Sequence, residues 1–218
     1  MEKILSRMEV RVLGCLIEKE LATPEYYPLT LNALANACNQ KSNRNPIMTM
    51  EETEVSASLD SLRARQLALV SAEGGRVPKY RHALMERLRL DPAELALLAE
   101  LLLRGPQTVG ELRNRGERMH PFADLAAVEE ALQELEERTP PLVAPLPRMP
   151  GHKEQRYTHL FAGEVEPLGE AHEQQELDRN IIMAENDRIA ILEEEISSLR
   201  SEVAELRRSV EEFKAQFE

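Results

Sequence analysis

The sequence predicts a mainly α-helical protein with small β-hairpin wings, arranged as tandem winged helix-turn-helix domains plus a C-terminal coiled-coil helix. Three observations predict this fold. One order of capping and apolar positions occurs twice, the composition favours helix, and the end of the chain carries a heptad pattern. We expect winged-helix domains at residues 1–86 and 87–161, a linker at 162–180 and the coiled-coil helix at 181–218.

The composition indicates aliphatic cores, because 42% of the 218 residues are hydrophobic but only 4% are aromatic. Cys15 and Cys38 each fall in an apolar helical pattern, so we expect buried free thiols in a reducing cytoplasm rather than a disulfide. The N-terminus lacks the apolar region of a signal peptide, and no stretch has the length of a membrane span. A cytoplasmic protein without a membrane partner is the expectation.

Each copy of the repeat begins with a capping signal followed by the same apolar spacing. A short helical segment then starts at a threonine, and a third helix carries apolar residues at a constant offset between the copies. The expected caps are Ser6 with Glu9, Asp91 with Glu94, Thr30 and Thr108. The matched apolar positions of the third helix are Val55, Leu59 and Leu62 against Val128, Leu132 and Leu135.

A short strand and a hairpin follow the third helix in each copy, with second strands at 79–82 and 156–159. Three helices and a two-stranded hairpin are the winged helix-turn-helix order. The first copy has five extra residues between its second and third helices, within the Asn- and Lys-rich segment from Cys38 to Met48. That insertion distinguishes the copies.

The tail is acidic and has a heptad repeat. Residues 162–218 contain 6 Lys and Arg against 16 Asp and Glu, whereas residues 1–86 contain 11 of each. β-Branched residues at a with Leu at d favour a parallel two-stranded coiled coil, so we expect a dimer. Its interface would contain Ile189, Leu192, Ile196, Leu199, Val203, Leu206, Val210 and Phe213. The alternative is a helix folded back onto its own domains.

The segment 29–46, and within it the run Cys38-Asn39-Gln40-Lys41-Ser42-Asn43-Arg44, resembles the YceH-like family of uncharacterised bacterial proteins. Residues 13–19 and 24–28 are also similar to that family, and the resemblance covers essentially the whole chain. It implies tandem winged helices and a bacterial cytoplasmic setting, and it implies no activity. Asn45 stands where an acidic residue is more usual in the motif, which weakens a charge-based role for this position.

Basic and amide residues of the first copy are suited to DNA. A winged helix that reads DNA places its third helix in the major groove and its wing along the phosphates. We expect nucleic-acid contacts from Asn39, Gln40, Lys41, Asn43, Arg44, Arg63, Arg65, Arg76, Lys79 and Arg81. Base readout by the third helix is disfavoured, because that helix opens with Glu51, Glu52 and Glu54.

Two further segments are read differently. The third helix of the second copy carries Glu129, Glu130, Glu134, Glu136 and Glu137, so this copy is interpreted as a spacer or protein-docking unit. The insertion of the first copy has three interpretations. The favoured one is a structured connection, since Asn side chains bond local backbone in irregular turns. The others are a phosphate contact and a contact with a protein or small ligand.

No pattern supports catalysis. The five histidines form no zinc-ligand spacing, and there is no Walker loop, dinucleotide glycine fingerprint or G-x-S-x-G elbow. We therefore expect no enzyme, no cofactor and no metal. Two functions remain: a dimeric regulator that binds duplex DNA, and a scaffold whose winged helices dock partner proteins. The basic residues of the first copy favour the regulator.

Overall fold

Residues 4–71, 77–148 and 154–163 are described by the computed structural model of the chain, and all lie within one unit, Met1–Pro167. Most of the predicted linker (162–180) and the whole predicted coiled-coil helix (181–218) lie outside the described residues. The proposed dimer contacts from Ile189 to Phe213 and the predicted phosphate contact Arg76 lie outside them as well. These predictions are not tested by the structure.

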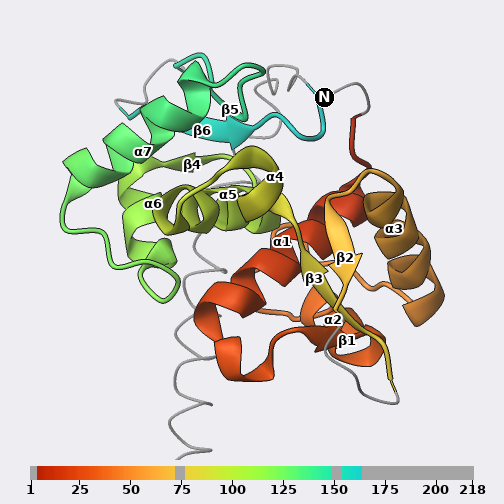
Figure 1. The fold of residues 1–218 in the computed structure, drawn as a ribbon. Coiled ribbons are helices and arrows are strands. Elements are labelled where there is room, and N and C mark those ends of the chain that lie inside the picture. The colour runs from red at the N-terminus through yellow and green to blue at the C-terminus, as the bar shows by residue number, and fades with distance from the viewer. Residues whose placement is uncertain (1–3, 72–76, 149–153, 164–218) are drawn as a thin grey trace, which may run out of the picture. The chain divides into compact units, whose positions relative to one another are not determined.

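The two halves of the described unit share the order helix, short strand, two helices and hairpin, and the first half has a 3-10 helix and α4 in addition (Figure 1). The first half contains α1 (Arg7–Ala22), a 3-10 helix (Pro24–Tyr26), β1 (Leu29–Thr30), α2 (Leu31–Cys38), α3 (Glu52–Ala64), β2 (Ala68–Val70), β3 (Lys79–His82) and α4 (Leu84–Leu88). The second half contains α5 (Pro92–Arg104), β4 (Gln107–Thr108), α6 (Val109–Gly116), α7 (Leu125–Glu137), β5 (Val143–Pro145) and β6 (Arg156–His159). The prediction of a mainly helical fold with small β-hairpins is confirmed.

Each half contains a three-stranded antiparallel sheet, in the orders β1-β3-β2 and β4-β6-β5. The hairpins were predicted, but the third strands β1 and β4 were not. Leu29 of β1 lies opposite Tyr80, and Gln107 of β4 lies opposite Tyr157. Each of these strands has two residues, which is too short for the alternation of apolar and polar side chains that identifies a strand in a sequence.

The predicted helix caps are confirmed. Ser6 and Glu9 form a reciprocal capping box at α1, in which the backbone N–H of Ser6 donates to Oε2 of Glu9 at 2.6 Å. Asp91 and Glu94 do the same at α5, where the N–H of Glu94 donates to Oδ1 of Asp91 at 2.8 Å. Thr30 and Thr108 cap α2 and α6. These signals lie within four residues of each other, so local sequence determines them.

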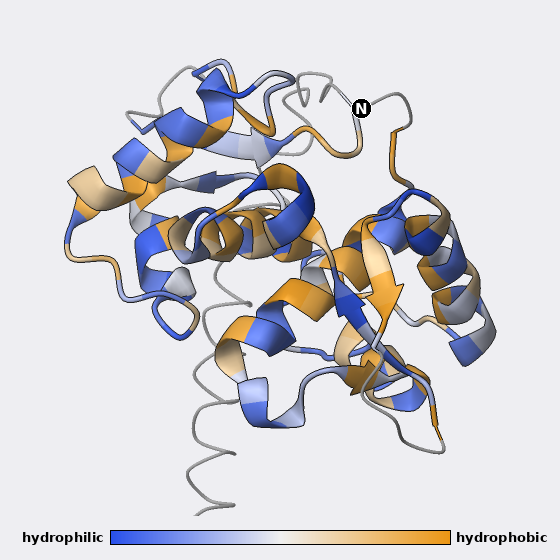
Figure 2. Cartoon of the chain, in the orientation of Figure 1, coloured by the Kyte–Doolittle hydropathy of each residue, from blue (hydrophilic) through white to orange (hydrophobic). Residues whose placement is uncertain are grey.

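The halves share one hydrophobic core, built where α1 packs against α5. Figure 2 colours most of α5 and much of α1 as hydrophobic. The apolar residues of α5 surround the helix, and those from Leu95 to Leu103 are buried. A helix that is apolar all round is buried on all sides, so α5 serves as the core helix of its own half and as the partner of α1. Among the described residues, no helix combines the length and apolar character needed to cross a bilayer.

Gly14 lies where α1 and α5 pack tightly against each other. A Cβ built on Gly14 would lie 3.0 Å from Cδ2 of Leu103 and 3.1 Å from Cβ of Leu102. A side chain at this position would therefore push the helices apart. Gly110 in α6 provides a contrast, because no atom lies within 4 Å of a Cβ built there.

We predict that Gly14→Val lowers the free energy of unfolding by about 1–3 kcal/mol, because overpacking displaces α5. The matched variant Gly110→Ala is expected to leave stability unchanged or raise it by up to about 1 kcal/mol, since alanine favours helix. Urea unfolding followed by circular dichroism measures both. A Gly14→Val protein as stable as the wild type would contradict the contact between α1 and α5.

Candidate functional site

The polar connection between α2 and α3, residues 39–51, is folded around the side chain of Arg44. That side chain is only 1% exposed. Its Nη2 lies 2.6 Å from Oε2 of Glu18 on α1, and its Nη1 donates to Oε1 of the same carboxylate at 3.1 Å. The guanidinium also donates to the carbonyl oxygens of Ala37 and Asn43 and to Oε1 of Gln40, at 2.8–3.2 Å. Arg44 is thus a buried, fully engaged cation.

The charge of Arg44 controls the ionisation of Glu18. Burial by itself raises the pKa of the Glu18 carboxyl, but the hydrogen bonds and charge of Arg44 outweigh it and lower that pKa below its ordinary value. The carboxylate is therefore charged at neutral pH although Glu18 is 4% exposed. A buried ion pair with several further hydrogen bonds is strongly destabilised when one partner is removed.

The two ends of the connection are held to the first half by other polar side chains. Arg11 of α1 donates from Nη1 to the carbonyl oxygen of Cys38 at 3.2 Å and from Nη2 to that of Pro46 at 2.5 Å. The side chain of Asn39 accepts from the N–H of Met50 at 2.7 Å and donates to its carbonyl oxygen at 2.8 Å. These bonds close the connection onto α1 and the start of α3.

The middle of the connection contacts α5 of the second half. The N–H of Asn45 donates to the carbonyl oxygen of Leu103 at 2.9 Å. Asn43 adopts a left-handed backbone conformation with φ of 57°, which asparagine tolerates, and its Oδ1 accepts from Nη2 of Arg104. Nε of Arg104 lies 2.9 Å from Oε2 of Glu100, whose pKa is raised by burial despite that contact. The connection therefore joins the two halves.

These contacts show where the structure places the predicted nucleic-acid residues of the connection. The guanidinium of Arg44 is enclosed by Glu18 and by backbone carbonyls, which leaves a phosphate no direct access to it in this structure. Asn39, Gln40 and Asn43 also bond the chain itself, as a structured connection requires. Lys41 is the exposed residue of this predicted set, and it makes no ion pair with a described residue.

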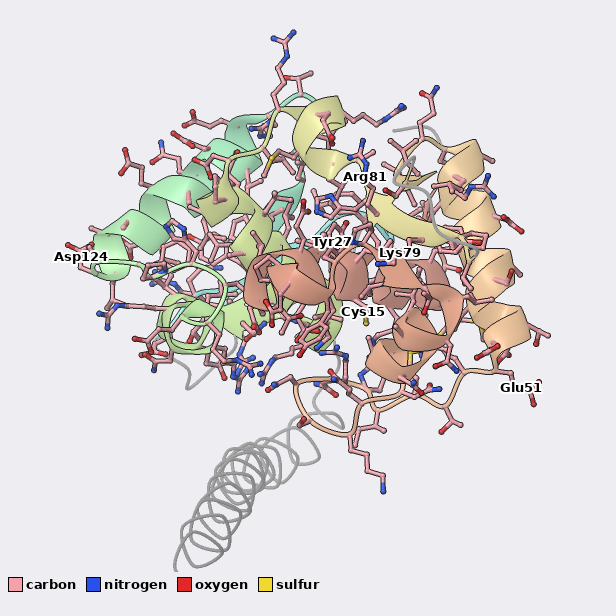
Figure 3. All side chains as sticks on the ribbon, turned by 60° about the horizontal axis from the view of Figure 1, so that its bottom comes forward. Cys15, Tyr27, Glu51, Lys79, Arg81 and Asp124 are labelled. Carbon is pink, nitrogen blue, oxygen red and sulfur yellow. The ribbon has the colours of Figure 1, made fainter. Side chains whose placement is uncertain are left out.

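The predicted contacts outside the connection are mostly paired with carboxylates. Nη1 of Arg63 lies 2.8 Å from Oδ1 of Asp60, Nη2 of Arg65 lies 3.3 Å from Oε1 of Glu9, and Nη1 of Arg81 lies 2.5 Å from Oε1 of Glu86. Lys79 is exposed and has no such partner among the described residues. It lies two residues before Arg81 on β3, and Figure 3 labels both. Lys41 lies in the connection after α2 and Lys79 lies on β3, so these two exposed cations come from separate elements.

The outward faces of α3 and α7 are acidic. Figure 3 shows their N-terminal ends, labelled at Glu51 and Asp124, on opposite sides of the unit. Glu51 at the N-cap of α3 is exposed, and so are Glu52 and Asp60 within that helix. The glutamates of α7 are all exposed: Glu129, Glu130, Glu134, Glu136 and Glu137. The range Leu125–Glu137 contains no Lys or Arg. The other side of α7 packs Val128, Ala131, Leu132 and Leu135 into the core.

Among the described residues, one group of carboxylates lies close enough together to hold a metal ion. Oxygen atoms of Asp91, Glu94 and Glu134 lie within 4.8 Å of one another. Asp91 and Glu94 form the capping box of α5, and Glu94 also binds Arg138 at 2.7 Å. Because local structural roles account for two of the three groups, this arrangement is no basis for a metal site.

Sequence reasoning missed four charged residues that organise the connection: Arg11, Glu18, Glu100 and Arg104. A signal for them was present. Arg11 and Glu100 interrupt apolar stretches, and Glu18 and Arg104 directly follow one. A charged residue on a core-facing helix requires a partner. The partners could not be identified from the helices alone, because Arg44 lies 26 residues from Glu18.

Comparison with known proteins shows a bacterial family. The profile of the family described as "Protein of unknown function, DUF480" matches residues 5–152. The chain is 72% identical to a UPF0502 protein of Geotalea uraniireducens, 68% to one of Geotalea daltonii and 65% to one of Geobacter sulfurreducens. Each alignment covers all of both chains. The resemblance to a family of uncharacterised bacterial proteins is confirmed, and these descriptions name no activity.

We predict that Arg44→Ala lowers the free energy of unfolding at pH 7 by about 3–5 kcal/mol, because it leaves the carboxylate of Glu18 buried without a partner. Lys41→Ala, an exposed change in the same connection, is expected to alter stability by less than about 0.5 kcal/mol. Urea unfolding measures both. Equal stability of the two variants would contradict the structural role of Arg44.

The pH dependence provides a second readout of the same variant. In the wild type the pKa of Glu18 is lowered by folding, so its contribution to stability is present above the unfolded value, about 4.3, and is lost as pH falls through the folded value. A protonated Glu18 needs no cation. The stability difference between wild type and Arg44→Ala should therefore shrink on acidification, and a difference independent of pH would contradict the ion pair.

Proposed function

The chain belongs to the DUF480 family, and we propose that it is a non-enzymatic scaffold whose tandem winged helices dock basic partner proteins. The order of elements supports the winged-helix assignment. Each half has three helices and a hairpin, with a short strand before the second helix that completes a three-stranded sheet. In this assignment α3 and α7 correspond to the helices that enter the major groove in DNA-binding relatives of the fold.

The observation that carries the proposal is the charge of α7. Five glutamates are exposed along this helix, and the range Leu125–Glu137 contains no Lys or Arg. The DNA backbone carries a negative charge about every 1.7 Å along its axis, so docking α7 into a groove would bring like charges together. A partner with Lys and Arg at its surface would instead be attracted, and complementary charge accelerates association.

The second supporting observation is that most arginines predicted to contact nucleic acid are already paired with carboxylates. Arg44 is buried against Glu18, and Arg63, Arg65 and Arg81 face Asp60, Glu9 and Glu86. Surface ion pairs are weak, about 0–1 kcal/mol, but each one reduces the net positive potential available to a phosphate. The face of α3 therefore offers a polyanion little attraction.

A DNA-binding regulator is the second candidate. Lys41 and Lys79 favour it, because both are exposed and make no ion pair with a described residue. In that function the first half would contact phosphates without base readout by α3. Binding of this kind is weak and depends steeply on salt.

We predict that reversing two charges on α7, in Glu130→Lys/Glu134→Lys, weakens binding of a protein partner at least tenfold. The partner is first captured by crosslinking in a bacterial extract and is then titrated as a purified protein. Glu25→Lys/Glu154→Lys is the control, because both glutamates are exposed, lie outside α3 and α7 and have no described ion pair. The control should bind as the wild type does.

The same proteins are mixed with labelled duplex DNA over a salt series. The scaffold proposal expects no binding at about 0.1 M salt, where exposed charges are partly screened. Binding at that salt, weakened by Lys41→Ala/Lys79→Ala and not by Glu25→Lys/Glu154→Lys, would contradict the scaffold and establish the DNA-binding candidate. Equal effects of the α7 variant and its control would contradict a role for the α7 face.

We further propose that the chain dimerises through a parallel coiled coil at 181–218, a segment outside the described residues. The heptad pattern of the sequence supports this. Light scattering is expected to give twice the chain mass for the full-length protein and the single-chain mass after deletion of residues 185–218. A full-length monomer would contradict the dimer and favour a tail folded back on the same chain.

A further inference from the structure

The hairpin formed by β2 and β3 has an outward face that is both apolar and basic. Residues opposite each other in an antiparallel pair share a face of the sheet, as do alternate residues of one strand. Leu69 lies opposite Arg81, and Lys79 precedes Arg81 by two residues, so these three side chains lie on one face. Leu69 is 38% exposed, and Val77, just before β3, is 58% exposed. We call Leu69, Val77, Lys79 and Arg81 the hairpin face.

The charge of the hairpin face is positive. Lys79 is exposed and makes no ion pair with a described residue. Arg81 lies 2.5 Å from a carboxylate oxygen of Glu86, but the Glu86 side chain is itself exposed. An exposed ion pair is weak, so Arg81 can still bond a carboxylate of another molecule. The hairpin face therefore suits a surface that presents carboxylates beside apolar side chains.

The outward face of α7 has that composition. Leu125, the first residue of α7, is 49% exposed. Glu129 follows it by four residues, so the two side chains are neighbours on the helix surface. Glu130 and Glu134 are exposed with the same spacing of four residues. Exposed glutamates alone are no evidence of a docking site, but an exposed leucine beside them is typical of a protein-binding surface. We call Leu125, Glu129, Glu130 and Glu134 the α7 face.

The two faces lie apart on one packed unit. Figures 1 and 3 show α7 and the β2–β3 hairpin on different sides of it, and Figure 3 labels Asp124 at the start of α7 well away from Lys79 and Arg81. Because α1 and α5 hold the halves in one core, the α7 face does not reach the hairpin face of its own molecule. Residues 1–161 contain 21 Lys and Arg against 23 Asp and Glu. Positive and negative charge are thus separated on a nearly neutral unit.

We propose that the α7 face of one molecule docks on the hairpin face of a second copy of the chain. The glutamates would lie against Lys79 and Arg81, and Leu125 would lie against Leu69 and Val77, so that charge and apolar surface both match. Duplex DNA would match the cations of the hairpin face but would leave its apolar side chains against phosphates. The inference rests on the proposed docking function of α7 and identifies its basic partner as another copy.

This contact joins two different surfaces, so it does not close on itself. After one contact forms, one molecule still presents its hairpin face and the other still presents its α7 face. A contact of this heterologous kind continues into a ring or an open chain of molecules. Assembly through these faces therefore adds to any pairing through the predicted coiled coil, and it depends on salt because exposed charges contribute to it.

Crosslinking tests which groups meet. Full-length proteins with natural nitrogen and with nitrogen-15 are mixed in equal amounts and treated with a carbodiimide. The reagent activates a carboxylate, a neighbouring lysine amine attacks it, and an amide forms with net loss of one water. We expect mass spectrometry to show Lys79 joined to Glu129, Glu130 or Glu134, in pairs of one natural and one labelled peptide. Lys41 is the matched amine, because it is exposed without a described ion pair and lies outside the hairpin face.

Charge reversal tests whether the contact drives assembly. Sedimentation velocity of the full-length protein is measured at about 0.1 M and about 1 M salt, where the Debye length is about 10 and about 3 Å. We expect association at the lower salt, and a dissociation constant raised at least about tenfold by Lys79→Glu or by Glu130→Lys/Glu134→Lys. A mixture of these two variants should associate as the wild type does, because each supplies the intact face that the other lacks. Lys41→Glu is the control and should leave association unchanged.

Several outcomes would overturn the inference. These are association that neither reversal weakens, a mixture that fails to recover it, and crosslinks to α7 as frequent from Lys41 as from Lys79. Crosslinks confined to peptides of one isotope would place the contact within a molecule and reject it too. Duplex binding that Lys79→Glu abolishes, without self-association at either salt, would assign the hairpin face to nucleic acid.

Titration of the separately captured protein partner distinguishes this inference from the proposed function. If Glu130→Lys/Glu134→Lys weakens binding of that partner while the wild type does not self-associate, only the second-copy inference fails. If the same variant changes neither self-association nor partner binding, the docking function of α7 fails and the inference fails with it.

Discussion

Arg44 brings a permanent positive charge into a place that water does not reach, and the surrounding chain is arranged to compensate it. Its guanidinium has five N–H donors, and it bonds Glu18, Gln40 and the carbonyl oxygens of Ala37 and Asn43. The pair fixes the connection between α2 and α3 against α1. The same connection reaches α5 through Asn45, so the relative position of the two halves depends on the ion pair as well as on the apolar core.

This use of charge inside the molecule limits what the surface can do. A polar loop with Asn, Lys and Arg has the composition of a phosphate-binding loop, yet four of its predicted contacts bond the chain itself. A side chain that satisfies buried backbone groups cannot leave them for a ligand without exposing an uncompensated polar atom. The polar and basic side chains of this loop are therefore mainly structural, whereas the glutamates of α7 are exposed to solvent.

Sequence reasoning succeeded where the determining residues are near each other. The capping boxes at Ser6 and Asp91 are set within four residues, and burial of Cys15 follows from helical periodicity. Sequence reasoning failed where the burial of a residue depends on a partner that is far away in the sequence. Arg residues are exposed on average, so the burial of Arg44 depends on Glu18, which sits on another element. The shared core was missed because an apolar face of α5 shows that something covers it but does not show that α1 does.

The fusion of the halves bears directly on a docking function. Two domains joined by a flexible linker would lose orientational freedom when one partner engaged both, and that loss opposes binding. Here α1 and α5 are packed so closely that Gly14 leaves no room for a side chain, and the connection around Arg44 adds polar contacts to the same junction. The N-terminal ends of the two acidic helices, α3 and α7, lie on opposite sides of this packed unit (Figure 3). A partner that contacts both faces, or two partners that contact one each, would meet a preformed arrangement, which is the property that a scaffold needs.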